Sequence, residues 1–157
     1  MVLIVDTHAL IWFLEGSDRL SAVALAQLND ATNSIVVPTI VLTEMRYLYA
    51  RNRVVVNVDD LIQIAEANER FGIYPLDLSV VEAVPLGLDI HDGIICRTAL
   101  VQQSTGGDQV KVITRDAAIR NAGLWRRSGE QCRFWSRLDR QSHSMEADPT
   151  TLALVLA

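Results

Sequence analysis

Cysteine, lysine and long apolar runs are scarce in this chain of 157 residues. The two cysteines, Cys96 and Cys132, are too few for a disulfide-stabilised scaffold, and neither lies at a metal-ligand spacing. No apolar run approaches the roughly 18 residues that a bilayer-spanning helix requires. The N-terminus lacks a basic segment followed by an apolar stretch and a small-residue cleavage site, so we expect no signal peptide and a cytoplasmic protein. These absences argue against a secreted disulfide scaffold and against a membrane-spanning chain.

What is present is an ordinary globular composition with an uneven charge. Half of the residues are hydrophobic, and the length suits one domain with a substantial core. The net charge is −5, but residues 1–110 carry −8 (14 acidic and 6 basic residues), residues 111–140 carry +5 (3 acidic and 8 basic), and residues 141–157 carry −2. A cationic segment after an acidic body could contact phosphates, although a solvated arginine-rich face explains the charge pattern taken alone more simply.

Short apolar runs alternate with amphipathic stretches along the chain. The predicted strands span residues 2–5, 34–37, 72–76 and 110–114, and the predicted helices span residues 7–14, 21–29, 39–50, 59–71, 79–84, 92–103 and 116–122. Strands separated by helices are typical of an α/β fold in which a central parallel sheet lies between two layers of helices. We assign one domain to residues 1–135 and a C-terminal extension of unassigned role to residues 136–157. The apolar end of that extension could pack on the body, pair as an edge strand or contact a partner.

Four acidic residues occupy comparable positions in this pattern. Asp6 directly follows the apolar run VLIV, and Asp116 follows the run VKVIT after one intervening residue. Asp92 precedes the apolar stretch GIICRTAL, and Glu44 lies within TIVLTEMRYLY. The carboxyl ends of parallel strands share one edge of a sheet, and a helical glutamate directs its side chain toward the N-terminus of its helix. We therefore expect the four carboxylates to converge on one pocket at that edge.

Each of these acids also has a purely structural interpretation. Asp6 and Asp116 could cap the helices that follow them, Asp92 could be a first-turn acid that favours the helix dipole, and Glu44 could lie on the surface. Carboxylates that gather repel one another, so a cluster implies a bound cation or raised pKa values. Oxygen ligands without cysteine or histidine suit Mg²⁺ or Mn²⁺, and such sites favour phosphoryl transfer.

The segments VLIVDTHALIWFL, VPTIVLTEM, LDIHDGIICRTAL and VITRDAAI resemble, in order and spacing, the signature blocks of PIN-domain ribonucleases. The opening DTHALIW is especially similar to the VapC-type toxins of prokaryotic type II toxin–antitoxin pairs. The resemblance covers about residues 1–125 and implies a PIN-like three-layer α/β/α fold. It also implies an endoribonuclease that hydrolyses single-stranded or loop RNA with Mg²⁺ or Mn²⁺ and inhibits growth as a toxin. The implied partners are RNA, a cognate antitoxin protein and a second copy in a homodimer.

The same resemblance assigns roles to individual acids. It implies that Asp6, Glu44, Asp92 and Asp116 are the catalytic residues and metal ligands, with Asp6 and Asp92 binding most directly. The family often has an acid at Asp89 as well, which makes it an alternative ligand. We prefer Asp92 because it immediately precedes the apolar run. The next residue is a glycine, where the family commonly has an arginine.

Other residues near these blocks have less specific roles. Thr114 matches the family's small hydroxyl before the last acid and could orient a carboxylate or contact the substrate. We expect the two histidines beside the acids to take part in packing or hydrogen bonding rather than catalysis, and the two aromatic residues of the first helix to lie in the core or face a partner; these are His8, His91, Trp12 and Phe13. The candidate phosphate contacts are Arg115, Arg120, Arg126 and Arg127.

Two other functions fit parts of this pattern. A receiver-like signalling domain also gathers acids and Mg²⁺ at strand ends, but it usually has two adjacent early acids and a late lysine. Here Asp6 has no acidic neighbour, and the one lysine, Lys111, lies within a predicted strand. A catalytically inactive PIN-like module would bind RNA or a partner without cutting, and the presence of all four acids argues against that alternative.

Overall fold

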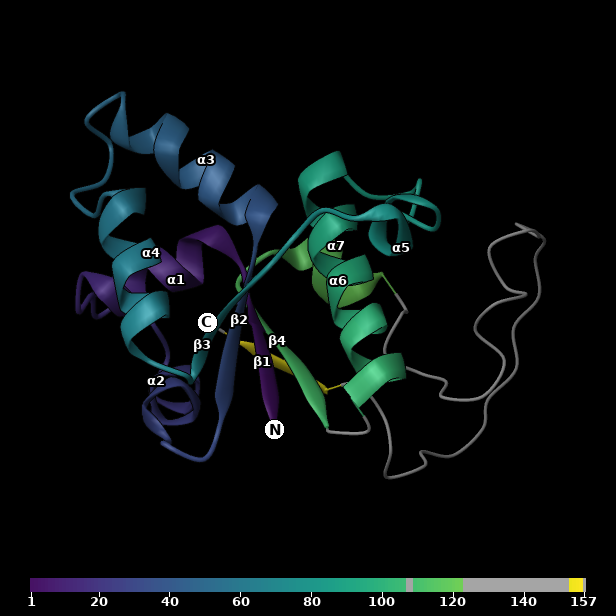
Figure 1. Cartoon of the computed structure of the whole chain (residues 1–157), viewed down its shortest axis with the longest axis horizontal. Coiled ribbons are helices and arrows are strands. Elements are labelled where there is room, and N and C mark those ends of the chain that lie inside the picture. Colours follow the sequence, from purple (N-terminus) through teal and green to yellow (C-terminus); the bar gives the residue numbers. More distant parts are fainter. Residues whose placement is uncertain (107–108, 123–152, 157) are drawn as a thin grey trace.

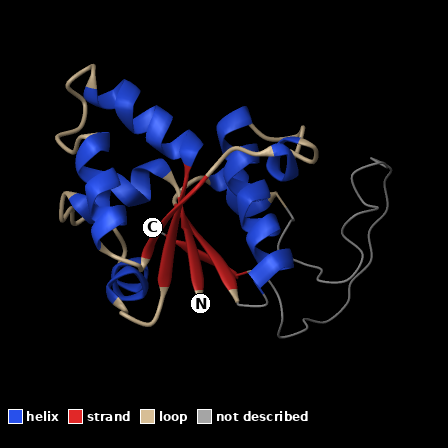
Figure 2. Ribbon diagram, viewed as in Figure 1, coloured by secondary structure: helices blue, strands red, loops and turns tan. Residues whose placement is uncertain are grey.

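The computed structural model describes residues 1–106, 109–122 and 153–156. A parallel sheet forms its centre, with helices on both sides (Figure 2). Its first four strands along the chain are β1 (Val2–Val5), β2 (Ser34–Pro38), β3 (Phe71–Tyr74) and β4 (Val110–Thr114). A fifth strand, β5 (Ala153–Leu156), pairs in parallel with β4, so part of the C-terminal extension is an edge strand. The predicted α/β fold with a central parallel sheet is confirmed, whereas the proposed boundary at residue 135 lies outside the described residues.

The seven predicted helices are all present, with shifts at their ends. They are α1 (Thr7–Leu14), α2 (Ala22–Asn29), α3 (Thr39–Tyr49), α4 (Val58–Ala67), α5 (Leu78–Val81), α6 (Ile90–Gly106) and α7 (Ala117–Asn121). In Figure 1, α1 to α4 lie on one side of the sheet and α5 to α7 on the other. None of the helices in the described ranges is both long and apolar enough to cross a membrane.

Three helix boundaries differ from the prediction for identifiable reasons. The helix α4 ends at Ala67 instead of residue 71, because Phe71 already pairs with β2 as the first residue of β3. The helix α5 begins at Leu78, one residue before the predicted start, since the Asp77 carboxylate caps it by accepting the N–H of Val80 at 3.2 Å. The helix α6 begins at Ile90, two residues before the predicted start, because the Asp89 carboxylate accepts the N–H of His91 in the first turn.

The apolar run that opens the chain is the centre of the core. Leu3, Ile4 and Val5 are fully buried in β1, which lies between β2 and β4. A strand covered on both faces has no solvent-facing side, which explains its unbroken apolar sequence. Cys96 is also fully buried, on the face of α6 that packs on the sheet, as predicted for a small core residue. Burial raises the pKa of its thiol to about 12, and Cys132 lies outside the described residues.

The strand order β3-β2-β1-β4-β5 creates a crevice that the sequence does not reveal. From β1 the chain builds outward to β2 and β3 on one side, and β4 lies on the other. The helices that follow β1 and β4, α1 and α7, therefore leave toward opposite faces (Figure 1), and open α/β sheets bind ligands at such a switch point. Receiver domains have the order 2-1-3-4-5, so this topology contradicts the receiver-like alternative.

Candidate functional site

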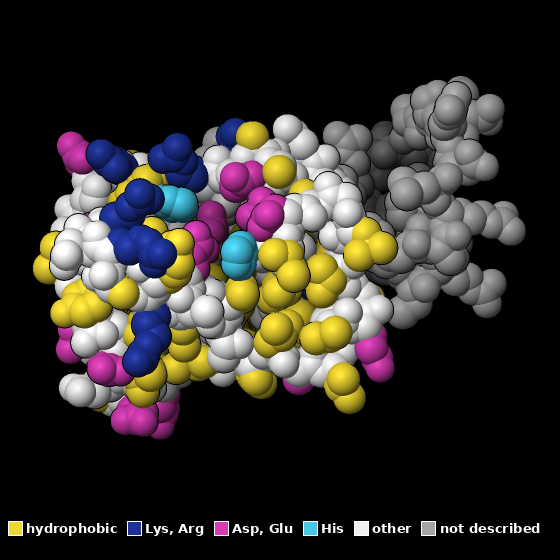
Figure 3. Space-filling view, turned by 90° about the horizontal axis from the view of Figure 1, so that it is seen from above, with side chains coloured by type: hydrophobic (Ala, Val, Ile, Leu, Met, Phe, Trp, Pro, Cys, Tyr) yellow, Lys and Arg dark blue, Asp and Glu magenta, His cyan; other side chains and the backbone are white. Residues whose placement is uncertain are grey.

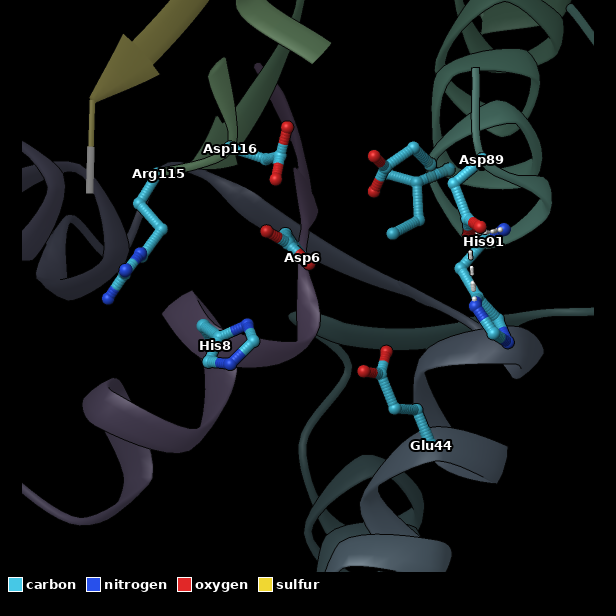
Figure 4. Close-up of a pocket in the computed structure, with 9 residues that line it drawn as sticks. Asp6, His8, Glu44, Asp89, His91, Arg115 and Asp116 are labelled. Atoms are coloured by element: carbon cyan, nitrogen blue, oxygen red, sulfur yellow. Dashed lines mark hydrogen bonds and ion pairs between the residues drawn. The ribbon is translucent and has the colours of Figure 1, made fainter. Parts of the chain in front are cut away.

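A pocket of about 280 Å³ opens at the carboxyl ends of β1 and β4. Figure 3 faces this edge of the sheet and shows acidic side chains gathered in a hollow between two histidines. All four predicted acids line the pocket, together with the alternative ligand Asp89 and one of the predicted arginines. The lining residues are Asp6, His8, Glu44, Asp89, His91, Asp92, Ile95, Arg115 and Asp116 (Figure 4).

Asp6 forms the floor of the pocket and is held by a buried threonine. It is only 6% exposed and occupies the N-cap position of α1, yet its side chain makes no capping hydrogen bond. Instead Oδ2 accepts the hydroxyl of Thr114 at 2.7 Å. Burial raises the pKa of Asp6, and the Thr114 hydrogen bond opposes part of that rise. The capping interpretation is therefore wrong for Asp6, and full burial places Thr114 behind it as an orienting residue rather than a substrate contact.

Glu44 reaches the pocket from α3 and is held in the same way. The hydroxyl of Thr7 donates to Glu44 Oε2 at 2.7 Å, and Thr7 is fully buried in the first turn of α1. Glu44 itself is half-buried, which contradicts a surface role. Sequence reasoning missed Thr7, because its contact with a residue 37 positions away depends on how α1 packs on α3. Its one visible signal is its position directly after Asp6.

Asp116 has a structural role and a place in the pocket at once. It is the N-cap of α7, and its Oδ1 accepts the N–H of Ala118 at 2.6 Å and that of Ile119 at 3.4 Å. Its own N–H donates to the Thr114 hydroxyl at 2.9 Å. The capping interpretation is thus correct for Asp116. Both capping bonds use the same oxygen, however, and the carboxylate still lines the pocket.

Two acids at the start of α6 line the pocket in different environments. Asp89 is exposed, and its Oδ1 accepts the N–H of His91 at 3.0 Å and lies 3.2 Å from His91 Nδ1. Asp92 is half-buried in the first turn. Burial, and after it the charges of four neighbouring carboxylates, raises the pKa of Asp92 to about 6. Asp92 therefore experiences the shared negative field of the pocket, while Asp89 is engaged as a helix cap.

The glycine after Asp92 is required by close packing. A Cβ at Gly93 would lie 2.8 Å from Val84 Cγ1 and 3.2 Å from the carbonyl oxygen of Pro85. A larger side chain would have to displace this turn. The turn before α6 therefore leaves no room at this position for the arginine that the sequence resemblance would lead us to expect.

A basic and aromatic group forms the wall of the pocket opposite Asp89 (Figure 4). The Cζ atom of Arg115 lies 5.3 Å from the centroid of the Trp12 ring, and the His8 ring lies 6.0 Å from the same ring. Trp12 is 7% exposed, so it supports this wall from within the core. Arg120 is exposed on α7 and does not line the pocket. The arginines at positions 126 and 127 lie outside the described residues.

The donor chemistry of the pocket fits a hard divalent cation. Carboxylate oxygens are the ligands that Mg²⁺ and Mn²⁺ prefer, and a cation would relieve the repulsion that raises the pKa of Asp92. In the conformation of the described part of the chain, no three histidine, cysteine or acidic side chains are grouped closely enough to hold a metal ion. The pocket thus brings the donors together without arranging them as a coordination sphere.

Comparison with known families agrees with this geometry. The family model of the PIN domain matches residues 3–123, a range that contains β1 except its first residue, β2 to β4 and the four predicted acids. No curated protein matches the chain. The matched range covers most of the sequence, so the chain belongs to the PIN domain family.

Proposed function

We propose that this protein is a metal-dependent endoribonuclease that hydrolyses RNA phosphodiester bonds. PIN domains are typically nucleases that act on RNA and use divalent metal ions. One observation carries the proposal for this chain. Carboxylates from four separate parts of the fold, Asp6, Glu44, Asp92 and Asp116, line one pocket at the topological switch point of the sheet.

These side chains have distinct tasks in the proposed reaction. Asp6 and Asp92 would hold Mg²⁺ or Mn²⁺ most directly, with Asp116 and Glu44 completing the donor set and Asp89 as the alternative ligand. A metal held there would lower the pKa of the attacking water and neutralise charge on the phosphate and the leaving oxygen. Glu44, which keeps one oxygen outside its threonine hydrogen bond, would orient that water.

Two buried hydroxyls prepare the site for this chemistry. Each donates to one carboxylate oxygen, Thr114 to Asp6 and Thr7 to Glu44, and so restricts the rotamers of a ligand before substrate arrives. Arg115 lines the pocket on the side away from α6. Its guanidinium offers a planar set of donors for a phosphate oxygen.

Cleavage of RNA by matched variants tests the proposal. The wild type is expected to cleave single-stranded RNA with Mg²⁺ or Mn²⁺ but not with excess chelator. Asp6→Asn and Asp92→Asn should each lose nearly all activity, whereas Asp18→Asn, on the exposed turn after α1, should retain it. Undiminished cleavage by both pocket variants would refute the site. A wild type that binds but never cleaves diverse RNAs would point to the inactive binding module.

We further propose that this ribonuclease acts as the toxin of a toxin–antitoxin pair. The support is the likeness of the segment DTHALIW to VapC-type toxins and a group of exposed apolar side chains within residues 76–90, a segment that ends next to the pocket residues Asp89 and His91. Figure 3 shows apolar side chains gathered beside the acidic hollow. Such a patch is suited to a protein partner. The exposed apolar side chains of this segment are Leu76, Leu78, Val81, Leu86 and Ile90, which are 44% to 96% exposed.

Expression in a bacterial host tests the toxin role. The wild type should arrest growth, and Asp92→Asn should not. A small reading frame directly upstream should encode a protein that restores growth and copurifies with the toxin. Leu86→Asp should weaken that complex, and light scattering will show whether the free toxin is the expected homodimer. Normal growth with fully active wild-type enzyme would contradict the toxin role alone.

A further inference from the structure

A second arginine–aromatic pair lies on the helix that supplies Glu44. The Cζ atom of Arg51 is 3.3 Å from the centroid of the Tyr47 ring. We propose that Tyr47 and Arg51 form a platform on which a nucleobase of single-stranded RNA binds beside the pocket. This inference rests on the proposed ribonuclease function and deepens it, because it names the surface that would hold the strand next to the cleaved bond.

The position of Tyr47 on α3 connects the platform to the pocket. Residues three apart share a helix face, so Tyr47 lies one turn beyond Glu44 on the same side of the helix. Glu44 lines the pocket, and Tyr47 is 56% exposed. In Figure 1, α3 leaves the end of β2 and runs away from the sheet. A strand bound with its phosphate at the acids could therefore continue along this face of α3.

The charge around the platform complements a nucleic acid. Residues 46–53 contain three arginines and two tyrosines but no acid, and they hold half of the six basic residues found in residues 1–110. Within the part of the chain that the structure describes, no carboxylate forms an ion pair with Arg51. Its charge is thus not neutralised by the protein. Figure 3 shows basic side chains gathered to one side of the acidic hollow.

The shape of the platform favours an unpaired base over other anionic partners. A tyrosine ring with a guanidinium over it presents flat, polarisable surfaces, and bases of single strands stack on such surfaces without sequence preference. Bases within a duplex are already stacked on one another and cannot use it. An acidic peptide would respond to the charge of Arg51 but would leave the ring unused.

Binding of RNA in the absence of cleavage tests the platform. The full chain carrying Asp92→Asn, kept in chelator, is titrated into a labelled single-stranded RNA and followed by fluorescence anisotropy. Adding Tyr47→Ala should weaken binding about tenfold, whereas Tyr47→Phe, which keeps the ring, should bind like the parent. Tyr49→Ala is the matched control. Tyr49 is 42% exposed on the same helix, but its side chain lies about 200° from that of Tyr47 around the helix axis.

The charge of the platform has its own readout. Arg51→Ala should weaken binding and reduce the slope of log K against log salt by about 0.7, as expected for one lost phosphate contact with a single strand. Arg19→Ala is the control. Arg19 is exposed and follows the C-terminal end of α1, whereas Asp6 precedes the N-terminal end of that helix. Circular dichroism should show the same fold for all variants, because the truncated side chains are exposed.

Several results would overturn the platform. These are equal binding losses in Tyr47→Ala and Tyr49→Ala, a loss in Tyr47→Phe, an equal loss for duplex RNA of the same sequence, and no binding of RNA by the parent. Binding of an acidic peptide in place of RNA would assign the surface to a protein partner. The cleavage assay remains separate: active wild type with normal binding by Tyr47→Ala refutes the platform alone. Weakened binding by Tyr47→Ala with an inactive wild type refutes the nuclease function and retains the platform.

Discussion

The carboxylates of the pocket repel one another, and replacing Asp92 by asparagine should relieve that repulsion. Burial and its neighbours raise the pKa of Asp92 from 3.8 to about 6. Because the pKa is higher in the folded state than in the unfolded state, the stability associated with protonated Asp92 is complete below about pH 4 and is lost as the pH rises through about 6. At neutral pH the ionised Asp92 side chain therefore lowers the free energy of unfolding of the metal-free protein. Asparagine has nearly the same shape and no charge, so the variant should be the more stable protein.

The magnitude follows from the size of the shift. A rise from 3.8 to about 6 corresponds to at most about 3 kcal/mol. Asp92 is only half-buried, so solvent screens much of this energy, and we expect about 1 kcal/mol. For a chain of this length, that gain should raise the melting temperature by about 2–4 °C.

Urea or thermal unfolding in chelator measures the effect. Asp92→Asn should be more stable than the wild type at about pH 7.5 and equal to it at about pH 4, where Asp92 is protonated. Asp18→Asn controls for the loss of one negative charge from an exposed site. A variant less stable than the wild type at neutral pH, or one stabilised equally at both pH values, would refute the electrostatic argument.

Two further predictions concern the proposed metal and the threonine behind Glu44. Mn²⁺ or Mg²⁺ should raise the melting temperature of the wild type by an amount that grows with ion concentration, and should leave Asp92→Asn nearly unchanged; equal shifts in both proteins would show that the ion binds elsewhere. Thr7→Val removes the hydroxyl that holds Glu44 but keeps the shape of the side chain, so kcat should fall about tenfold with little change in KM, and Thr7→Ser should recover most of the loss. An unchanged kcat for Thr7→Val would mean that Glu44 needs no positioning.

The local structure of this chain follows closely from its sequence. The apolar run VLIV is a strand whose last three residues are fully buried, because it has no polar face to present to water. The helix predicted directly after it, residues 7–14, has the observed bounds. The errors lie at the ends of helices, where contacts with neighbouring segments set the boundary. The helix α4 stops early because Phe71 belongs to the sheet, and α5 begins one residue before the predicted start because Asp77 caps it.

The sequence predicted that the four acids would line one pocket, but it did not predict the hydrogen bonds that each of them makes. That they would line one pocket followed from a general property of parallel sheets. Whether each would also cap a helix did not follow. Asp6 and Asp116 both precede helices, yet only Asp116 accepts capping hydrogen bonds, while Asp6 turns to a threonine 108 positions away. A local motif does not reveal whether a carboxylate will accept a hydrogen bond from the helix that follows it or from a residue far away in the chain.

The sequence by itself determined the elements, the parallel sheet and the identity of the acids, because these depend on periodicity, burial and chain order, which are local. Tertiary structure alone decided the strand order around β1, and with it the crevice where the acids meet. It also decided the hydrogen bond that holds Glu44. That contact and the strand order arise from packing between segments far apart in the chain. Their distances are set by the whole core, and no pattern of neighbouring residues encodes them.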